Sequence, residues 1–318
     1  PWALASGGQA LAMARNLPEQ TAALVLVALP GGQPREVGRF EGRIDALCWS
    51  HDGGRLAFLV SRRDDLSGQL VRQSLRLYDL AAGRQVTLYT REFRPEEASR
   101  LGLWLESWVP GDLALYVVYA LEGTDDPGTL YALDMHGGEP QLISEEYLLK
   151  GVRAVSALTS EVLLRRRVSS VGVGPRASPL YVARAEPDGS LAEVRLLSPA
   201  DWIVGAVAWS PEGQRVVVER HEIQTHGTFS AHLWLLSLDD SLPRQLTSDP
   251  EYREERPVWM PDGLRIVFDR WQATRPEPAG LWILSLDTGP QRLAEKGARP
   301  QTSSWLSGFL GPPPAPGN

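Results

Sequence analysis

The sequence predicts an all-β chain that folds as a single six-bladed β-propeller with four antiparallel strands in each blade. Two observations lead to this prediction: a β-hairpin motif returns about every fifty residues, and a second pattern of one strand followed by a turn occurs six times. A fixed period of that length indicates a repeat architecture. Several short strands per repeat, separated by turn residues, are typical of a propeller.

The hairpin motif consists of a short strand ending in Trp, a tight turn and a second, alternating strand. Clear copies run over residues 48–58, 208–218 and 258–268, and a weaker copy runs over residues 108–115. Pro, Asp and Gly between the two strands supply the backbone dihedral angles that a tight turn requires. Each copy therefore predicts one β-hairpin.

The second pattern is an aliphatic or aromatic strand that ends at a turn containing Gly or Asp. Its copies are Leu24–Leu29, Leu75–Leu80, Leu130–Met135, Leu180–Ala185, Leu233–Leu238 and Leu281–Leu286. One more short strand follows each turn, so each repeat predicts four strands. A single sheet would expose an apolar face, which radial packing of the blades buries. The tryptophans that end the first strands are therefore predicted to wedge between blades: Trp49, Trp108, Trp209 and Trp259.

The repeats also predict the limits of the blades. Blades 2 to 6 are expected at residues 43–90, 103–145, 150–197, 203–248 and 256–294. Blade 1, at residues 2–40, nearly lacks a first strand, because residues 4–13 match only the turn and second strand of the motif. We expect residues 300–306, around Trp305, to complete blade 1 and close the ring within one domain of residues 1–310. Residues 311–318 are expected to form a disordered tail.

These hairpins, with the Leu-Trp-x-Leu-Ser strand that follows two of them, resemble the degenerate propeller repeats of the TolB type over most of residues 4–306. The resemblance implies a propeller fold. Proteins with such repeats include periplasmic scaffold proteins, propeller domains of bacterial lipoproteins and the gating propeller of prolyl oligopeptidase-like enzymes. The partner-binding residues of TolB lie outside the matching motif, so the resemblance implies none for this chain.

In this strand order the hairpin turns lie on one face of the propeller, the turn face. The connections from second to third strands lie on the other, the loop face, with long loops expected at residues 61–73, 122–128, 165–179, 220–231 and 270–280. Long loops on a rigid scaffold are the usual seat of binding. The candidate partner-binding residues of this face are Arg62, Arg63, Asp125, Asp126, Arg166, Arg167, His221, His226, Trp271 and Arg275.

Local motifs for catalysis or metal binding fail on spacing. His221 and His226 are five residues apart in an expected loop, whereas a helical zinc site places two His at i and i+4. Asp64–Asp65 and Asp125–Asp126 lack the alternating oxygen ligands and closing Glu of a calcium loop. Ser50–Asp52 lies in a hairpin turn on the turn face, away from the expected site. We therefore predict no metal, no cofactor and no locally encoded catalytic group.

Composition narrows the partners. A formal net charge of −7 argues against a general nucleic-acid binder, which needs a basic face. Cys48 is the single cysteine, so no disulfide can form within the chain. No apolar run approaches the roughly 18 residues of a membrane span.

The leading prediction is a monomeric, non-catalytic binding or scaffolding module. We expect it outside the bacterial cytoplasm, periplasmic or at the cell surface, with any tether supplied by sequence beyond this chain, and docking a protein or cell-surface partner. Two alternatives stay open. One is an enzyme, either a propeller hydrolase or lyase or the regulatory propeller of a prolyl oligopeptidase-like enzyme, which a cluster of His and carboxylates with perturbed pKa values would favour. The other is a glycan or small-molecule binder using Trp202 and Trp271.

Overall fold

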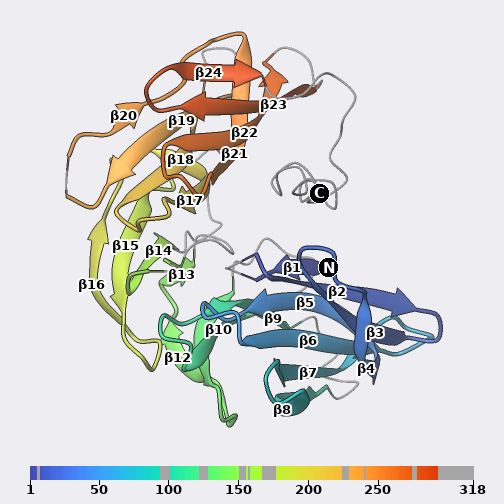
Figure 1. Cartoon of the computed structure of the whole chain (residues 1–318). Helices are drawn as coiled ribbons and strands as arrows, with labels where there is room; N and C mark the ends of the chain where they lie inside the picture. The colour runs from blue at the N-terminus through green and yellow to red at the C-terminus, as the bar shows by residue number, and fades with distance from the viewer. Residues whose placement is uncertain are drawn as a thin grey trace, which may run out of the picture.

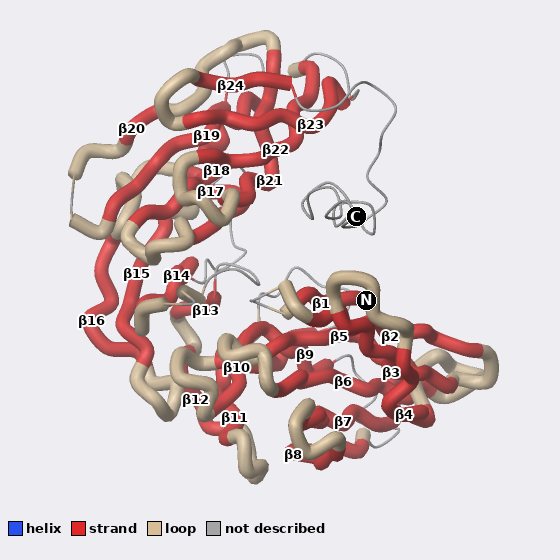
Figure 2. Tube along the Cα trace, in the orientation of Figure 1, coloured by secondary structure: helices blue, strands red, loops and turns tan. Residues whose placement is uncertain are grey.

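The computed structural model describes residues 1–5, 8–93, 101–121, 128–149, 155–156, 158–166, 177–223, 229–239, 241–273 and 278–292. Within these ranges the chain consists of strands and loops, and no helix is present that could cross a membrane (Figure 2). The prediction of an all-β fold is confirmed.

The strands of the described residues form six four-stranded antiparallel sheets, which we call blades 1 to 6 in chain order. Blade 1 holds β1 (Trp2–Leu4), β2 (Ala10–Leu17), β3 (Thr21–Ala28) and β4 (Arg35–Glu41), and blade 2 holds β5 (Arg43–Trp49), β6 (Arg55–Arg63), β7 (Leu70–Asp79) and β8 (Arg84–Glu92). Blade 3 holds β9 (Leu101–Trp108), β10 (Ala114–Leu121), β11 (Thr129–Asp134) and β12 (Gln141–Ser144), and blade 4 holds β13 (Tyr147–Leu149), β14 (Glu161–Arg166), β15 (Leu180–Ala185) and β16 (Leu191–Leu196). Blade 5 holds β17 (Ile203–Trp209), β18 (Arg215–Ile223), β19 (Phe229–Ser237) and β20 (Arg244–Gln245), and blade 6 holds β21 (Tyr252–Trp259), β22 (Arg265–Gln272), β23 (Pro278–Ser285) and β24 (Gly289–Arg292).

The six blades follow one another around an arc, with blade 1 and blade 6 at its two ends (Figure 1). The first strand of each blade lies toward the centre of the arc and the fourth strand lies at its outer edge (Figure 1). This arrangement is that of a six-bladed β-propeller. Four apolar clusters fill the space between neighbouring blades, and among the described residues none of the four joins blade 6 to blade 1.

Blade 1 differs from the sequence prediction in the origin of its first strand. β1 supplies it, pairing Trp2 with Met13 and Leu4 with Leu11. Leu4 occupies the position that Trp has in blades 2, 3, 5 and 6. The turn that follows shows this equivalence, because Gly8 comes four residues after Leu4 with φ of 70°, as Gly53 comes four residues after Trp49 with the same φ. Three paired residues thus provide the strand that we had assigned to the C-terminal segment. Residues 300–306 and 311–318 lie outside the described residues, so ring closure and the disordered tail remain predictions.

Three of the four motif tryptophans wedge between blades as the sequence predicted, and the fourth, Trp209, is partly buried against an apolar cluster of blades 3 to 5. Trp108 is fully buried, and Trp49 and Trp259 are each 8% exposed. Each of the three donates its indole Nε1–H to a carbonyl oxygen on the first strand of the preceding blade. The acceptors are Ala3 for Trp49 (3.0 Å), Cys48 for Trp108 (3.1 Å) and Ala208 for Trp259 (3.1 Å). A buried indole N–H needs such an acceptor, so this repeated bond fixes how each blade sits against its neighbour.

One hairpin turn departs from the repeat. Gly53, Gly213 and Gly263 occupy its left-handed position with φ of 70°, 72° and 66°, but blade 3 has Asp112 there with φ of 59°. Asp tolerates this region better than most side chains do. Its carboxylate accepts hydrogen bonds from the backbone amides of His51 (2.9 Å) and Asp52 (3.0 Å). The unusual residue therefore ties the turn of blade 3 to the turn of blade 2.

Candidate binding site on the loop face

The loop-face candidates that the structure describes lie in strands and not in loops. β6 contains Arg62 and Arg63, β14 ends at Arg166, and β18 and β22 contain His221 and Trp271. The loops predicted at 61–73, 220–231 and 270–280 are therefore shorter, and the prediction was wrong at both ends of each. The hairpin ladders continue past the apolar runs, because a ladder pairs backbone amides and carbonyls and does not require apolar side chains.

The same five residues share one face without forming one cluster. All lie near the end of the second strand of their blade, and second strands run in the same direction in every blade, from the turn face to the loop face. They belong to blades 2, 4, 5 and 6, so they are spread around the arc (Figure 1). The other five candidates, Asp125, Asp126, Arg167, His226 and Arg275, lie outside the described residues.

Each of these side chains has a different environment. Arg166 pairs through Nε with Glu146 Oε1 at 2.8 Å, with both side chains more than half exposed. His221 hydrogen-bonds through Nε2 to Glu219 on the same strand. The Nε1 atom of Trp271 is buried and has no hydrogen-bond partner. A buried indole donor without an acceptor is uncommon, which marks Trp271 as a position to test for binding.

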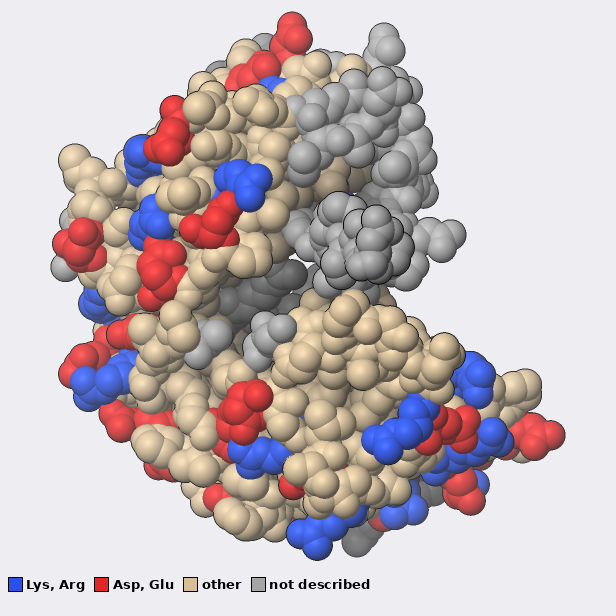
Figure 3. All heavy atoms as spheres, viewed as in Figure 1, with Lys and Arg blue, Asp and Glu red and all other residues tan. Residues whose placement is uncertain are grey.

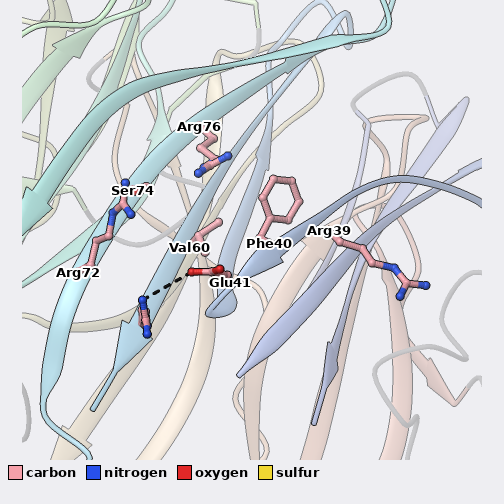
Figure 4. Close-up of a pocket in the computed structure, with 8 residues that line it drawn as sticks. Arg39, Phe40, Glu41, Val60, Arg72, Ser74 and Arg76 are labelled. Carbon is pink, nitrogen blue, oxygen red and sulfur yellow. Dashed lines mark ion pairs between the residues drawn. The ribbon is translucent and has the colours of Figure 1, made fainter. Parts of the chain in front are cut away.

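A pocket of about 160 Å³ opens between blades 1 and 2 and includes Arg62 (Figure 4). Arg39, Phe40 and Glu41 reach it from β4, and Arg72 and Arg76 reach it from β7. Charged side chains of both signs also gather over β2 to β4, beside this pocket (Figure 3). We call this feature the arginine pocket.

Ion pairs neutralise three of the four arginines in the arginine pocket. Arg39 pairs with Glu36 (2.5 Å), Arg62 with Glu41 (3.5 Å) and Arg72 with Glu92 (3.1 Å). Among the described residues no carboxylate lies within ion-pair distance of Arg76. Its guanidinium instead lies over the Phe40 ring, with Cζ 5.1 Å from the ring centroid.

Sequence reasoning found Arg62 but missed Arg39, Arg72 and Arg76. A signal for two of them was present, because Arg72, Ser74 and Arg76 alternate along one strand and must point to the same side of the sheet. Arg72 had been placed in a loop, which hid this alternation. Arg39 lies on another blade, and no local pattern brings it to β7.

A second polar cluster lies between the inner strands of blades 5 and 6. Glu219 Oε2 accepts the Arg256 amide (3.1 Å), and Arg256 Nη2 pairs with Asp269 Oδ2 (2.7 Å). Burial raises the pKa of Glu255, and the nearby Glu219 charge raises it further. Burial likewise raises the pKa of Asp269, against the opposing effect of Arg256. Carboxyl groups with raised pKa values beside a His are chemically suited to donate or accept protons.

A cavity of about 640 Å³ lies at the centre of the arc, on the turn-face side of the first strands. Trp2, Trp49, Trp209 and Trp259 contribute to its lining, together with Glu106. Burial raises the pKa of Glu106, against the opposing effect of Arg165. Burial also raises the pKa of the Cys48 thiol to about 12, so this thiol carries little thiolate at neutral pH.

The residues proposed for glycan binding do not form a platform. Trp202 is 5% exposed and packs edge-to-face against Trp234, with ring centroids 4.9 Å apart. Arg220 covers its ring, with Cζ 4.6 Å from the centroid. Stacking with these two side chains leaves Trp202 no face for a sugar, so this candidate was wrong.

The structure also describes the side chains of Ser50, His51 and Asp52 and one of the two His residues considered as metal ligands. Ser50 Oγ donates to Asp52 Oδ1 (2.5 Å), whereas His51 Nδ1 contacts Asp112 Oδ1 (2.7 Å), so the three side chains stabilise turns. His221 lies in β18 and not in the expected loop. In the part of the chain that the structure describes, no group of three or more His, Cys, Asp and Glu side chains could hold a metal ion.

No protein-family model and no curated protein sequence matches this chain. Similar solved structures are propellers. Prolyl endopeptidases match with a TM-score of 0.66 and 14% identity over 92% of this chain and 41% of theirs. An oligogalacturonate lyase from Vibrio parahaemolyticus matches with a TM-score of 0.60 and 11% identity over 84% of this chain and 73% of the lyase.

The propeller domain of the Trilobed protease from Pyrococcus furiosus, described as having an open velcro topology, matches with a TM-score of 0.58 and 14% identity over 92% of this chain and 79% of that domain. TolB from Acinetobacter baumannii also matches, with a TM-score of 0.49 and 15% identity over 91% of this chain and 65% of TolB. This chain spans less than half of the prolyl endopeptidases. At these identities the similarity shows the propeller fold alone.

Proposed function

We propose that this propeller is a non-catalytic binding module that docks a protein or cell-surface partner through its loop face, outside the bacterial cytoplasm. One observation carries the proposal: the ends of the second strands bring Arg62, Arg63, Arg166, His221 and Trp271, from four blades, to a single face. Arg and Trp anchor many protein interfaces. A sheet scaffold that presents widely spaced side chains on one face suits docking better than it suits catalysis, which needs groups within hydrogen-bond reach of one another.

The proposal is tested by photo-crosslinking in cells of the source organism. A photoreactive amino acid replaces Arg63 or Trp271 on the loop face, or Leu264, which is 53% exposed in a hairpin turn of blade 6 on the turn face. We expect Arg63 and Trp271 to crosslink to the same partner and Leu264 to give no such product. Crosslinks from Leu264 alone, or none from both loop-face positions, would sink the proposal. Cell fractionation in the same experiment tests the expected location outside the cytoplasm.

A second candidate function is an enzyme, favoured by the cluster of His221, Glu219, Glu255 and Asp269. Glu255 and Asp269 have raised pKa values, which is a feature of general acids. Assays with prolyl peptides and with oligogalacturonate, the substrates suggested by the names of the similar propellers, test it. Activity in the native protein that falls about a hundredfold or more in Glu255→Gln would support catalysis. Activity unaffected by that change would exclude this cluster.

A further inference from the structure

The arginine pocket contains a cation whose hydrogen-bonding capacity is not satisfied by the described protein groups. Arg76 is partly buried on β7, and its Nε atom is inaccessible to solvent and lacks a hydrogen-bond partner. Burial lowers the pKa of Arg76, and the positive charge of Arg72 lowers it further. A buried donor without an acceptor is costly, and a buried charge without a counter-ion is more so. A bound anion would supply the counter-charge that Arg76 lacks among the described residues.

The Phe40 ring orients the guanidinium of Arg76 in the pocket. Phe40 packs edge-to-face against Phe58, with centroids 5.1 Å apart, and lies under the guanidinium of Arg76. An aromatic ring that occupies one face of a guanidinium leaves the N–H groups at its edge free to donate in the plane. Figure 4 shows Arg76 facing Phe40 across the pocket, whereas Arg39 points away from it. Arg76 is therefore the arginine best placed to hold a ligand, and Arg72 lines the same pocket from the same strand.

Charge favours an anion as the ligand. The pocket has a volume of about 160 Å³, which is enough for a small group such as one carboxylate. Glu41, paired with Arg62 at 3.5 Å and with its side chain 82% exposed, lies at the rim and is free to turn outward.

We propose that the arginine pocket binds the carboxylate of an acidic side chain on the partner that docks on the loop face. This inference rests on the proposed function and adds the chemistry of one anchor point: a guanidinium fork donates in-plane hydrogen bonds to the two carboxylate oxygens. Arg62 and Arg72 lie near the loop-face ends of their strands, so a ligand enters the pocket from the docking face. The partner therefore presents an acidic residue to the groove between blades 1 and 2.

The test measures binding of a fluorescently labelled hexaglutamate peptide to the whole chain by anisotropy at low ionic strength. We expect Arg76→Gln and Arg72→Gln each to weaken binding about tenfold or more, since each removes a charge-assisted donor. Glu41→Gln should strengthen binding, because it removes the competing carboxylate. The matched control is Arg84→Gln, which changes the net charge equally at an exposed position on the turn-face side of the same blade. Thermal unfolding checks that each variant folds. If Arg76→Gln does not fold, Arg72→Gln still tests the pocket, because the Arg72 side chain is 45% exposed and its substitution should disturb the fold less.

Three results would overturn the proposal. The first is equal hexaglutamate binding by the native protein and both pocket variants. The second is an equal loss in Arg84→Gln, which would indicate general charge attraction. The third is Arg76-dependent binding of inorganic phosphate without binding of hexaglutamate, which would make the pocket a site for a free anion. Crosslinking from Arg63 and Trp271 that persists in Arg76→Gln would leave the docking face standing while the anchor fails.

Discussion

The interface between blades 2 and 3 and the interface between blades 5 and 6 occupy equivalent places in the repeat but have opposite chemistry. The first is built from fully or almost fully buried aliphatic residues such as Leu59, Leu75 and Leu115. The second also contains an apolar cluster, but Glu254 and Arg270, with side chains 1% and 8% exposed, form an ion pair at 3.2 Å within it. Ten residues after the motif Trp, blade 2 has Leu59 where blade 6 has Asp269. Radial packing of the blades therefore tolerates a buried ion pair beside an apolar cluster.

The charged interface is completed by hydrogen bonds and ring contacts. Glu254 Oε2 accepts from Thr247 Oγ1 and contacts His232 Nδ1, both at 2.9 Å. Arg270 pairs with Asp249 at 2.7 Å, and its guanidinium lies 3.9 Å from the Tyr252 ring centroid. A buried ion pair adds little to the free energy of unfolding when compared with a well-packed apolar pair. Removing one partner is nevertheless costly, because it leaves the other charge buried and unpaired. The two interfaces should therefore respond differently to substitution.

The largest effect is expected for Arg270→Ala. This change leaves the Glu254 carboxylate buried without its cation, which should lower the free energy of unfolding by about 3–5 kcal/mol. Urea unfolding at neutral pH measures the loss. The control is Arg244→Ala, an exposed arginine of blade 5. If Arg270→Ala lowers the free energy of unfolding no more than the control does, the Glu254–Arg270 ion pair does not stabilise the interface.

The apolar interface is tested by Leu75→Ala, which should cost about 3 kcal/mol through lost burial and the cavity left behind. This loss should not change with salt concentration, since no charge is involved. Val86→Ala, 47% exposed on the neighbouring strand, serves as the control. A salt-dependent loss would contradict the contrast drawn between the two interfaces.

A smaller effect is expected for Asp112→Asn, which weakens the tie between the turns of blades 2 and 3. Burial alone would raise the pKa of Asp112, but hydrogen bonds from His51 and Asp52 hold it below its ordinary value. The charged carboxylate thus stabilises the fold above a pH of about 4, and this contribution is lost as the pH falls through the lowered pKa. Asp112→Asn should cost about 1–2 kcal/mol at neutral pH and flatten the acid limb of the stability curve.

Unfolding by urea between pH 3 and pH 7 measures that curve. Exposed Asp201→Asn should leave it unchanged. An acid limb for Asp112→Asn as steep as that of the native protein would show that the carboxylate does not bind the turn of blade 2 in solution.

The smallest effect is expected for Glu255→Gln at the charged interface. Its dependence on pH is opposite to that of Asp112. The raised pKa of Glu255 means that the folded state favours the protonated form. Its contribution is therefore fully present at low pH and is lost as the pH rises through the raised pKa. Glu255→Gln should remove this decline and leave the stability of the protein at neutral pH equal or slightly higher. A lower stability at neutral pH would assign Glu255 a stabilising ion pair with Arg253 instead.

The fold was predictable because its determinants are local. The Trp, Pro, Asp and Gly of each hairpin lie within eleven consecutive residues, as in 208–218, and strand alternation follows directly from the sequence. Strand ends were predicted less well, because β6 and β18 continue into polar residues such as Arg63 and His221 that carry no strand signal. The first strand of blade 1 was missed for a similar reason. Three residues, Trp2–Leu4, are too short for a pattern, yet they suffice to pair with β2.

The sequence by itself determined the number of repeats, their hairpins and the face to which the second strands point, since these depend on neighbouring residues and on the two-residue period of a strand. Only the tertiary structure decided the arginine pocket and the Glu254–Arg270 interface. Phe40 and Arg76 meet because blade 1 packs on blade 2, and Glu254 meets His232 because blade 6 packs on blade 5. Contacts between blades join residues that the repeat places far apart, and their partners are set by how the sheets pack and not by any local pattern.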